Sequence, residues 1–262
     1  MSEHNITVEG GTSVLLPTAG KYCDRNIIIT AMGGGSSDSD VEKYLEAQHA
    51  EVVLPNAESI KPYAFYKDKI ITQITMPKVK SISTYAFYAC LNLALTSLPS
   101  GITSIGEYAF ESCTNLALTS LPSGLTSISK NAFDECTNLA LTSLPSGITS
   151  IGDYAFYNCS KLALTSLPSG ITSIGVNAFY NCSKLALTSL PSGITSIGTQ
   201  AFRSCSAISS LTFKGTPTSI ASNAFSSCPR LLTINVPWAE GAVANAPWGA
   251  TNATINYNYT GE

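Results

Sequence analysis

The sequence has few charged residues, two histidines and no long apolar run, and each scarcity excludes a class of function. Charged residues make up 12% of the 262 residues, and the net charge is −3. A basic surface for nucleic acid or for an anionic membrane is therefore not expected. No apolar stretch approaches the roughly 20 residues needed to span a bilayer. Residues 1–9 also lack the basic and apolar regions of a signal peptide, so we do not expect this segment to direct export.

No group of residues resembles a catalytic or metal-binding site. His4 and His49 lie near one end of the chain, without the Ser, Cys or carboxylate neighbours of a triad or metal centre. Gly33-Gly34-Gly35 lacks the lysine of a phosphate-binding loop. Four carboxylates fall on variable parts of single repeats and are expected to be solvated: Glu107, Glu111, Asp134 and Glu135. We predict no catalytic residues, no metal and no cofactor.

An Ala-Phe pair recurs every 23 residues, and a cysteine follows three residues after each phenylalanine. The phenylalanines at this spacing are Phe87, Phe110, Phe133, Phe156, Phe179, Phe202 and Phe225. The cysteines are Cys90, Cys113, Cys136, Cys159, Cys182, Cys205 and Cys228. A fixed period of this length predicts a solenoid, in which one repeat forms one coil.

The cysteine spacing favours one buried structural row of thiols. Equivalent residues of stacked coils lie about 4.8 Å apart, and small thiols suit a buried row. A zinc site would need paired ligands two to four residues apart, and the seven repeated cysteines contain no such pair.

The segment from Leu144 to Leu162 illustrates one repeat. Pro145-Ser146-Gly147 predicts a turn, because proline lacks an amide donor and glycine permits positive φ. Ile148 and Ile151 are expected to point inward along a short extended or irregular segment. The spacing of the next apolar residues predicts a brief helical turn packed on the core; they are Ala155, Phe156, Cys159 and Leu162.

The outer repeats carry an L-x-x-L-x-L strand pattern, as in Ile208-x-x-Leu211-x-Phe213, but in five central repeats the middle apolar position is a threonine. Strand alternation then places a row of leucines outward: Leu95, Leu118, Leu141, Leu164 and Leu187. Serines flank this row, and together they form a candidate ligand-binding stripe on the concave face: Ser97, Ser120, Ser143, Ser166 and Ser189. The alternative is a bulge in each strand that turns the leucine inward and the threonine outward.

The motif I-T-S-I-G-x-Y-A-F-x-x-C-x-x-L, seen at 102–116 and 148–162, strongly resembles the BspA-like, or Treponema-type, leucine-rich repeats. The resemblance covers about residues 60–237 and includes eight Ala-Phe pairs. It implies a right-handed leucine-rich-repeat solenoid with parallel β-strands on the concave face and short helical turns or strands opposite. It also implies adhesion and the binding of host proteins, and we expect a protein or glycan ligand on a cell surface. The central threonines depart from the family pattern and leave the concave surface open.

Two end segments resemble parts of tail-associated proteins from phages and prophages of gut Firmicutes. They are residues 13–31 and 236–261. This resemblance implies a component of a virion or prophage particle, docked through its N-terminal module. The alternative is a bacterial surface or secreted adhesin.

Composition divides the chain into five parts. Residues 1–32 are expected to form a small β module, with short strands at 6–8, 14–16 and 27–29, that needs self-association or a tail protein to bury its apolar face. Residues 33–40 form a flexible linker, 41–59 an N-terminal helical cap, and 60–237 about eight repeats. Residues 238–262 form a C-terminal β cap in which Trp238 and Trp248 cover the last coil or, alternatively, stack on a carbohydrate.

These patterns predict a non-catalytic binding protein. The residues around each Ala-Phe pair vary from repeat to repeat and are expected on the convex or lateral surface. If they are only solvated, the uniform concave stripe binds the ligand. If they are selected for contact, recognition moves to that variable surface.

Overall fold

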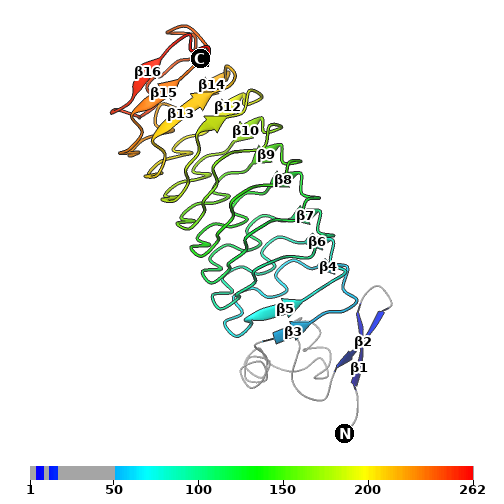
Figure 1. Cartoon of the computed structure of the whole chain (residues 1–262). Helices are drawn as coiled ribbons and strands as arrows, with labels where there is room; N and C mark the ends of the chain where they lie inside the picture. Colours follow the sequence, from blue (N-terminus) through cyan, green and yellow to red (C-terminus); the bar gives the residue numbers. More distant parts are fainter. Residues whose placement is uncertain (1–3, 9–11, 17–50, 262) are drawn as a thin grey trace.

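The computed structural model describes residues 4–8, 12–16 and 51–261. From residue 51 onward the chain winds into an elongated solenoid of about nine turns, seen as a stack of coils in Figure 1. Strands of neighbouring coils pair in parallel, so each coil is held by the equivalent backbone one repeat away. The predicted solenoid is therefore confirmed.

The strands are short and recur with the sequence period. They are β1 (His4–Val8), β2 (Thr12–Leu16), β3 (Glu51–Val53), β4 (Ser59–Ile60), β5 (Gln73–Thr75), β6 (Ser81–Ile82), β7 (Ser104–Ile105), β8 (Ser127–Ile128), β9 (Ser150–Ile151), β10 (Ser173–Ile174), β11 (Ser189–Leu190), β12 (Ser196–Ile197), β13 (Ser210–Phe213), β14 (Ser219–Ile220), β15 (Thr233–Asn235) and β16 (Thr254–Asn256).

One side of the solenoid is built from Ser-Ile strands of two residues. They form a three-stranded sheet, β4-β6-β7, and a five-stranded sheet, β14-β12-β10-β9-β8. Each serine pairs with the serine 22 or 23 residues away, as Ser150 does with Ser173, and each isoleucine is buried. The sequence pattern predicts an extended or irregular segment here, and the structure forms two short parallel ladders, one of three strands and one of five.

A second side carries the L-x-x-L-x-L strands of the outer repeats. β3 pairs with β5 near the N-terminal end, and β11, β13, β15 and β16 form a sheet near the C-terminal end. In β13 the pattern residues Leu211 and Phe213 are both buried, as predicted. Between β5 and β11 this side forms no strand, although isolated backbone hydrogen bonds still join the coils, such as that from Ala140 N to Leu118 O (3.1 Å).

The third side, hereafter the turn face, follows each Ala-Phe pair and differs from the prediction. The described residues contain no helix, so the expected helical turns are replaced by pairs of tight turns. Tyr154 and Asn158 both have positive φ, at 56° and 55°. Left-handed residues four apart cannot continue a right-handed helix. The amide of Phe156 instead donates to Ala178 O of the next coil at 2.8 Å.

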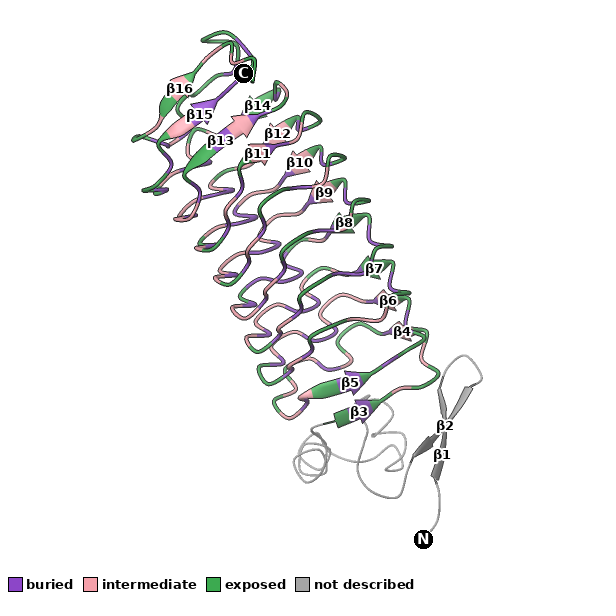
Figure 2. Cartoon of the chain, viewed as in Figure 1, coloured by how far each residue is buried: buried purple, intermediate pink, exposed green. Residues whose placement is uncertain are grey.

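Phenylalanines and cysteines form two continuous rows inside the solenoid. Eight phenylalanines from Phe65 to Phe225 stack with ring centroids 4.9 to 5.7 Å apart. Each thiol donates to the carbonyl of a phenylalanine on the preceding coil, as Cys136 Sγ does to Phe110 O at 3.0 Å. Figure 2 shows that buried positions recur in successive coils of the solenoid.

The two ends depart from the repeat in different ways. β1 and β2 form an antiparallel hairpin, whereas the strand expected at 27–29, the linker and the helix expected at 41–50 lie outside the described residues. Residues 51–59, predicted to belong to the helical cap, instead contain β3 and the start of β4.

At the C-terminal end, β16 pairs in parallel with β15 and extends the sheet. Trp238 and Trp248 are buried, and their ring centroids lie 6.2 Å apart. The indole of Trp248 donates to Ala244 O at 2.7 Å. Rings in these positions cover the last coil and are not available to stack on a carbohydrate.

Candidate binding surfaces

The predicted leucine stripe is wrong, because its five leucines are buried. Leu95, Leu118, Leu141, Leu164 and Leu187 are at most 5% exposed. The next residue in each coil, such as Thr142 beside Leu141, is exposed instead. The facing given by the alternative therefore holds, with leucine inward and threonine outward, but between β5 and β11 these central segments form no strand and hence no bulge. Two consecutive residues turn outward between Leu141 and Leu144, and the apolar side chains on both sides reach the core.

Because the leucines are buried, the surface on this side of the central coils consists of threonines and serines. We call it the Thr-Ser face, and its members are Thr96, Thr119, Thr142, Thr165 and Thr188 with Ser97, Ser120, Ser143, Ser166 and Ser189. All are exposed except Ser189, which is half-buried. Because the threonine hydroxyls face outward, they do not need buried hydrogen-bond partners.

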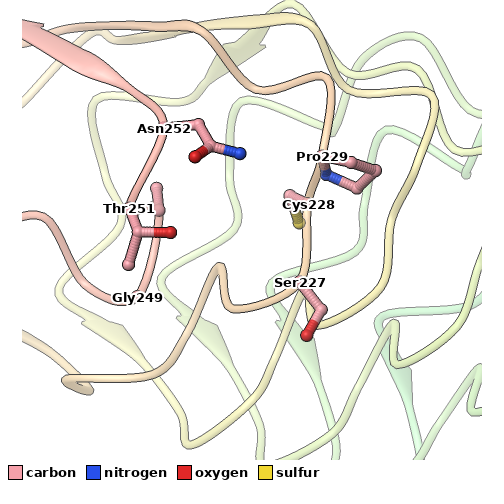
Figure 3. Close-up of a pocket in the computed structure, with 7 residues that line it drawn as sticks. Ser227, Cys228, Pro229, Gly249, Thr251 and Asn252 are labelled. Atoms are coloured by element: carbon pink, nitrogen blue, oxygen red, sulfur yellow. The ribbon is translucent and has the colours of Figure 1, made fainter.

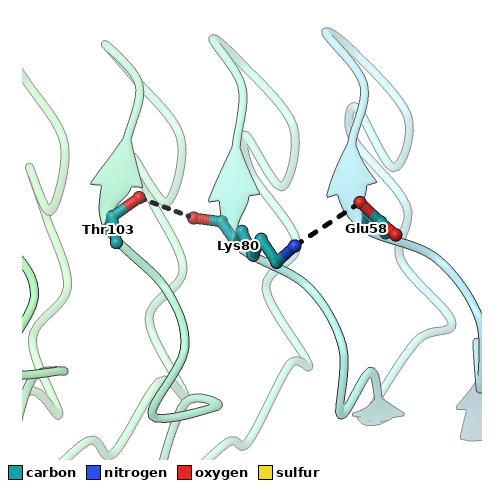
Figure 4. A network of polar contacts seen from close by, with 3 residues as sticks. All are labelled: Glu58, Lys80 and Thr103. Carbon is teal, nitrogen blue, oxygen red and sulfur yellow. Dashed lines mark hydrogen bonds and ion pairs between the residues drawn. The ribbon is translucent and has the colours of Figure 1, made fainter.

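A second row of threonines precedes the Ser-Ile strands. Here the hydroxyl of one coil donates to the carbonyl of the coil before it, as Thr172 Oγ1 does to Thr149 O at 3.2 Å. Figure 4 shows the N-terminal part of this row, where Thr103 Oγ1 donates to Lys80 O at 3.3 Å and Lys80 Nζ pairs with Glu58 at 3.6 Å. Both charged side chains are largely exposed, so the ion pair contributes little stability.

The cysteine row has no chemistry of its own. The seven cysteines are buried free thiols, and burial is the first cause that raises their pKa, to about 11 for Cys228. Thiolates are the nucleophilic and metal-binding form, so a raised pKa makes these cysteines unreactive. Within residues 51–261, no cluster of His, Cys, Asp and Glu could hold a metal ion.

Tyrosines gather on the turn face in stacked pairs. Tyr85 stacks on Tyr63 and Tyr108 with centroids 5.1 and 4.6 Å apart, and Tyr88 stacks on Tyr66 at 4.9 Å. Farther along the solenoid, Tyr157 and Tyr180 stack at 4.7 Å. The variable residues around Ala-Phe are thus not all independent surface positions, because several continue as ladders from coil to coil.

Between these tyrosines lies a group of carboxylates, and one of them is not solvated as predicted. Asp134 is only 8% exposed, and its Oδ2 accepts a hydrogen bond from Asn131 Nδ2 at 2.7 Å. Burial, with Glu111 and Glu135 adding repulsion, raises the pKa of Asp134 to about 7. Burial likewise raises the pKa of Glu111.

Asp134→Asn should stabilise the fold in a pH-dependent way. The folded-state pKa of Asp134 is raised from 3.8 to about 7, so the stabilising effect of its protonated form is lost as the pH rises through that range. We expect the free energy of unfolding of the variant to exceed that of the wild type by about 1–2 kcal/mol at pH 8 and to differ little at pH 4, measured by urea unfolding. An equal gain at both pH values would contradict the burial argument.

A pocket of about 260 Å³ lies near the C-terminal end (Figure 3). It is lined by Ser227, Cys228, Pro229, Gly249, Ala250, Thr251 and Asn252. None of these side chains is a carboxylate or a base, and Cys228 is buried with a raised pKa. The pocket therefore offers hydrogen-bonding groups without a general acid or base for catalysis.

The fold and its surfaces define a class of protein: a repeat solenoid that presents long rows of side chains, which is typically a non-catalytic binding scaffold. The family model for the BspA type leucine rich repeat region matches residues 44–162 and 126–242. The chain therefore belongs to the BspA-type leucine-rich repeat family. No helix of the described residues is long and apolar enough to cross a membrane.

Solved structures of bacterial leucine-rich repeat proteins are similar to this chain. One from T. pallidum is 32% identical, with a TM-score of 0.53, over 70% of this chain and 78% of that one. One from Eubacterium ventriosum is 26% identical, with a TM-score of 0.47, over 59% of this chain and 42% of that one. A leucine rich cell surface protein from Faecalibacterium prausnitzii is 21% identical, with a TM-score of 0.42, over 98% and 86%. No curated protein matches the chain.

Proposed function

We propose that the protein is a bacterial surface or extracellular adhesin that binds a protein ligand on a cell surface through the repeated surface of its solenoid. The observation that carries the proposal is the Thr-Ser face, where the same two exposed residue types recur on five consecutive coils. Family membership supports a binding role, since leucine-rich repeat solenoids use extended repeated surfaces for recognition.

Repetition favours a ligand that is itself extended or present in many copies. Each coil offers the same hydroxyls at about 4.8 Å intervals, so single contacts are weak but can form many times. The face carries no charged residue in its two rows, so recognition there depends on hydrogen bonds and shape. A glycan with repeated hydroxyls is the alternative ligand.

Binding of the full chain to intact gut bacteria and to immobilised host matrix proteins tests the proposal. Thr142→Asp combined with Thr165→Asp places two charges on the Thr-Ser face, and we expect it to weaken binding about tenfold or more. The matched control is Thr126→Asp combined with Thr218→Asp, two exposed threonines beside the Ser-Ile strands. Equal binding by all three folded proteins would place recognition elsewhere, and retained binding after protease treatment of the cells would favour a glycan.

A second candidate is a phage or prophage tail component, favoured by the resemblance of residues 13–31 and 236–261 to tail-associated proteins. In this role residues 1–32 dock into a tail assembly, and the solenoid contacts the target cell. Cross-linking of the full chain to itself and to co-expressed tail proteins tests it. If deletion of residues 1–32 leaves every cross-link unchanged, the tail role loses its basis.

A further inference from the structure

One row of the turn face changes from aromatic to acidic and back. The residues after the first six Ala-Phe pairs are, in successive coils, Tyr66, Tyr88, Glu111, Asp134, Tyr157 and Tyr180, and the last two pairs are followed by Arg203 and Ser226. Tyr88 stacks on Tyr66 with the planes 14° apart, and Tyr157 stacks on Tyr180 with the planes 17° apart. Each inner tyrosine therefore has one ring face covered by its partner, while its other face is directed along the row toward Glu111 and Asp134.

These residues form a notch with aromatic ends and an acidic floor. Tyr88 and Tyr157 are three coils apart, which is roughly 14 Å from the strand spacing. Glu111 and Asp134 are shorter than tyrosine and fill the two coils between them. Glu135 lies beside them, where its Oε2 accepts a hydrogen bond from Ser112 Oγ at 3.0 Å. We call Tyr88, Glu111, Asp134, Glu135 and Tyr157 the acidic notch.

Two oxygens of the notch are acceptors without donors. Oε2 of Glu111 and Oδ1 of Asp134 are buried, and no described group donates a hydrogen bond to either. Asp134 is more than nine-tenths buried. Burial without a donor leaves the charge of these carboxyl groups poorly compensated, so a cation held over the notch is attracted more strongly than it would be by an exposed acidic patch.

Among the described residues, the cationic side chains near the notch contact tyrosines and form no ion pair with its carboxylates. Lys67 Nζ lies 5.0 Å from the centroid of Tyr66 and 6.0 Å from that of Tyr88, and Lys130 Nζ lies 5.9 Å from that of Tyr108, so both cations rest on tyrosines of the turn face. Arg203 lies over Tyr180 at 5.6 Å, at the outer side of its stack. The chain itself thus pairs cations with the tyrosines around the notch, and it leaves the acidic floor unpaired.

We propose that the acidic notch binds arginine side chains of a basic segment on a partner protein. A guanidinium is planar, donates several hydrogen bonds to carboxylates and stacks on aromatic faces, so it matches the floor and both ends of the notch. This inference rests on the proposed binding function and names the chemistry of one partner. A neutral glycan could stack on the two tyrosines but would leave the carboxylates uncompensated.

A fluorescent octa-arginine peptide and the full chain test the inference by anisotropy at physiological salt. Glu111→Gln combined with Glu135→Gln keeps side-chain shape and removes two charges, and we expect about tenfold weaker binding. Glu58→Gln combined with Glu240→Gln removes two exposed charges elsewhere, and we expect less than about a twofold change. Equal losses in both variants would mean bulk attraction and would overturn the notch, as would an absence of peptide binding by the wild type.

The aromatic ends have their own test. Tyr157→Leu removes a ring face directed at the acidic floor, whereas Tyr63→Leu removes an exposed ring of another row. We expect several-fold weaker peptide binding for the first and no change for the second. Cell binding by the wild type without any peptide binding would overturn the notch alone. Peptide binding at the notch without cell binding would count against the proposed adhesin instead.

Discussion

Leu141→Asp combined with Leu164→Asp is expected to abolish the folded solenoid. Both leucines are fully buried, so each aspartate would place a carboxylate in the core without a partner. We expect a loss of more than about 4 kcal/mol of unfolding free energy, which is exceptional for surface changes and typical of a buried unpaired charge. Circular dichroism should show lost β-structure, and thiol labelling of the buried cysteines should rise sharply.

The neighbouring threonines provide the matched control. Thr142→Asp combined with Thr165→Asp introduces the same two charges one residue away, on the exposed Thr-Ser face. This variant should retain its circular dichroism spectrum and protected thiols, with stability within about 0.5 kcal/mol per site. A folded leucine variant or an unfolded threonine variant would mean that the threonines of the central coils face the core and the leucines face solvent.

The sequence left open which side chains of these central segments face the core. The outer repeats place their middle apolar residue six positions after the cysteine, as in Cys205 and Leu211, whereas the central repeats place it five positions after, as in Cys136 and Leu141. Alternation along an ideal strand favours the first pattern for every coil. In the central coils the chain gives up the strand and keeps both apolar side chains inside, because burial of a leucine outweighs the loss of a regular backbone ladder.

The repeat could be predicted because the residues that recur with its period are small or apolar and suit only the core. Ala155, Phe156 and Cys159 are completely buried, as the sequence spacing indicated. Their local conformation was not predictable, since spacings of one and three residues fit both a helical turn and the paired left-handed turns that occur. The turns form because backbone amides donate hydrogen bonds to the next coil, as Phe156 N does to Ala178 O, and a single repeat does not contain these partners.

The acidic notch was missed for a related reason. Asp134 and Glu111 look like ordinary solvated carboxylates when each is seen within its own repeat. They become neighbours only because equivalent positions align from coil to coil, which places Tyr88 and Tyr157 on either side of them. Aligning the repeats and following one position through all coils would have revealed the aromatic and acidic alternation, although it would not have shown the burial of Asp134.

Phe156→Ala is expected to destabilise the solenoid strongly and to make its two halves unfold separately. Phe156 is fully buried, and its ring centroid lies 5.7 Å from that of Phe133 and 5.5 Å from that of Phe179. Removing it leaves a cavity and ends two stacking contacts, so we expect a loss of about 3–5 kcal/mol. Coils interact only with their neighbours, so the two halves should then unfold in separate, broader urea transitions. Phe156→Leu, which fills most of the space, should cost less and keep a single transition; an equal loss would show that stacking, and not the filled volume, couples the coils.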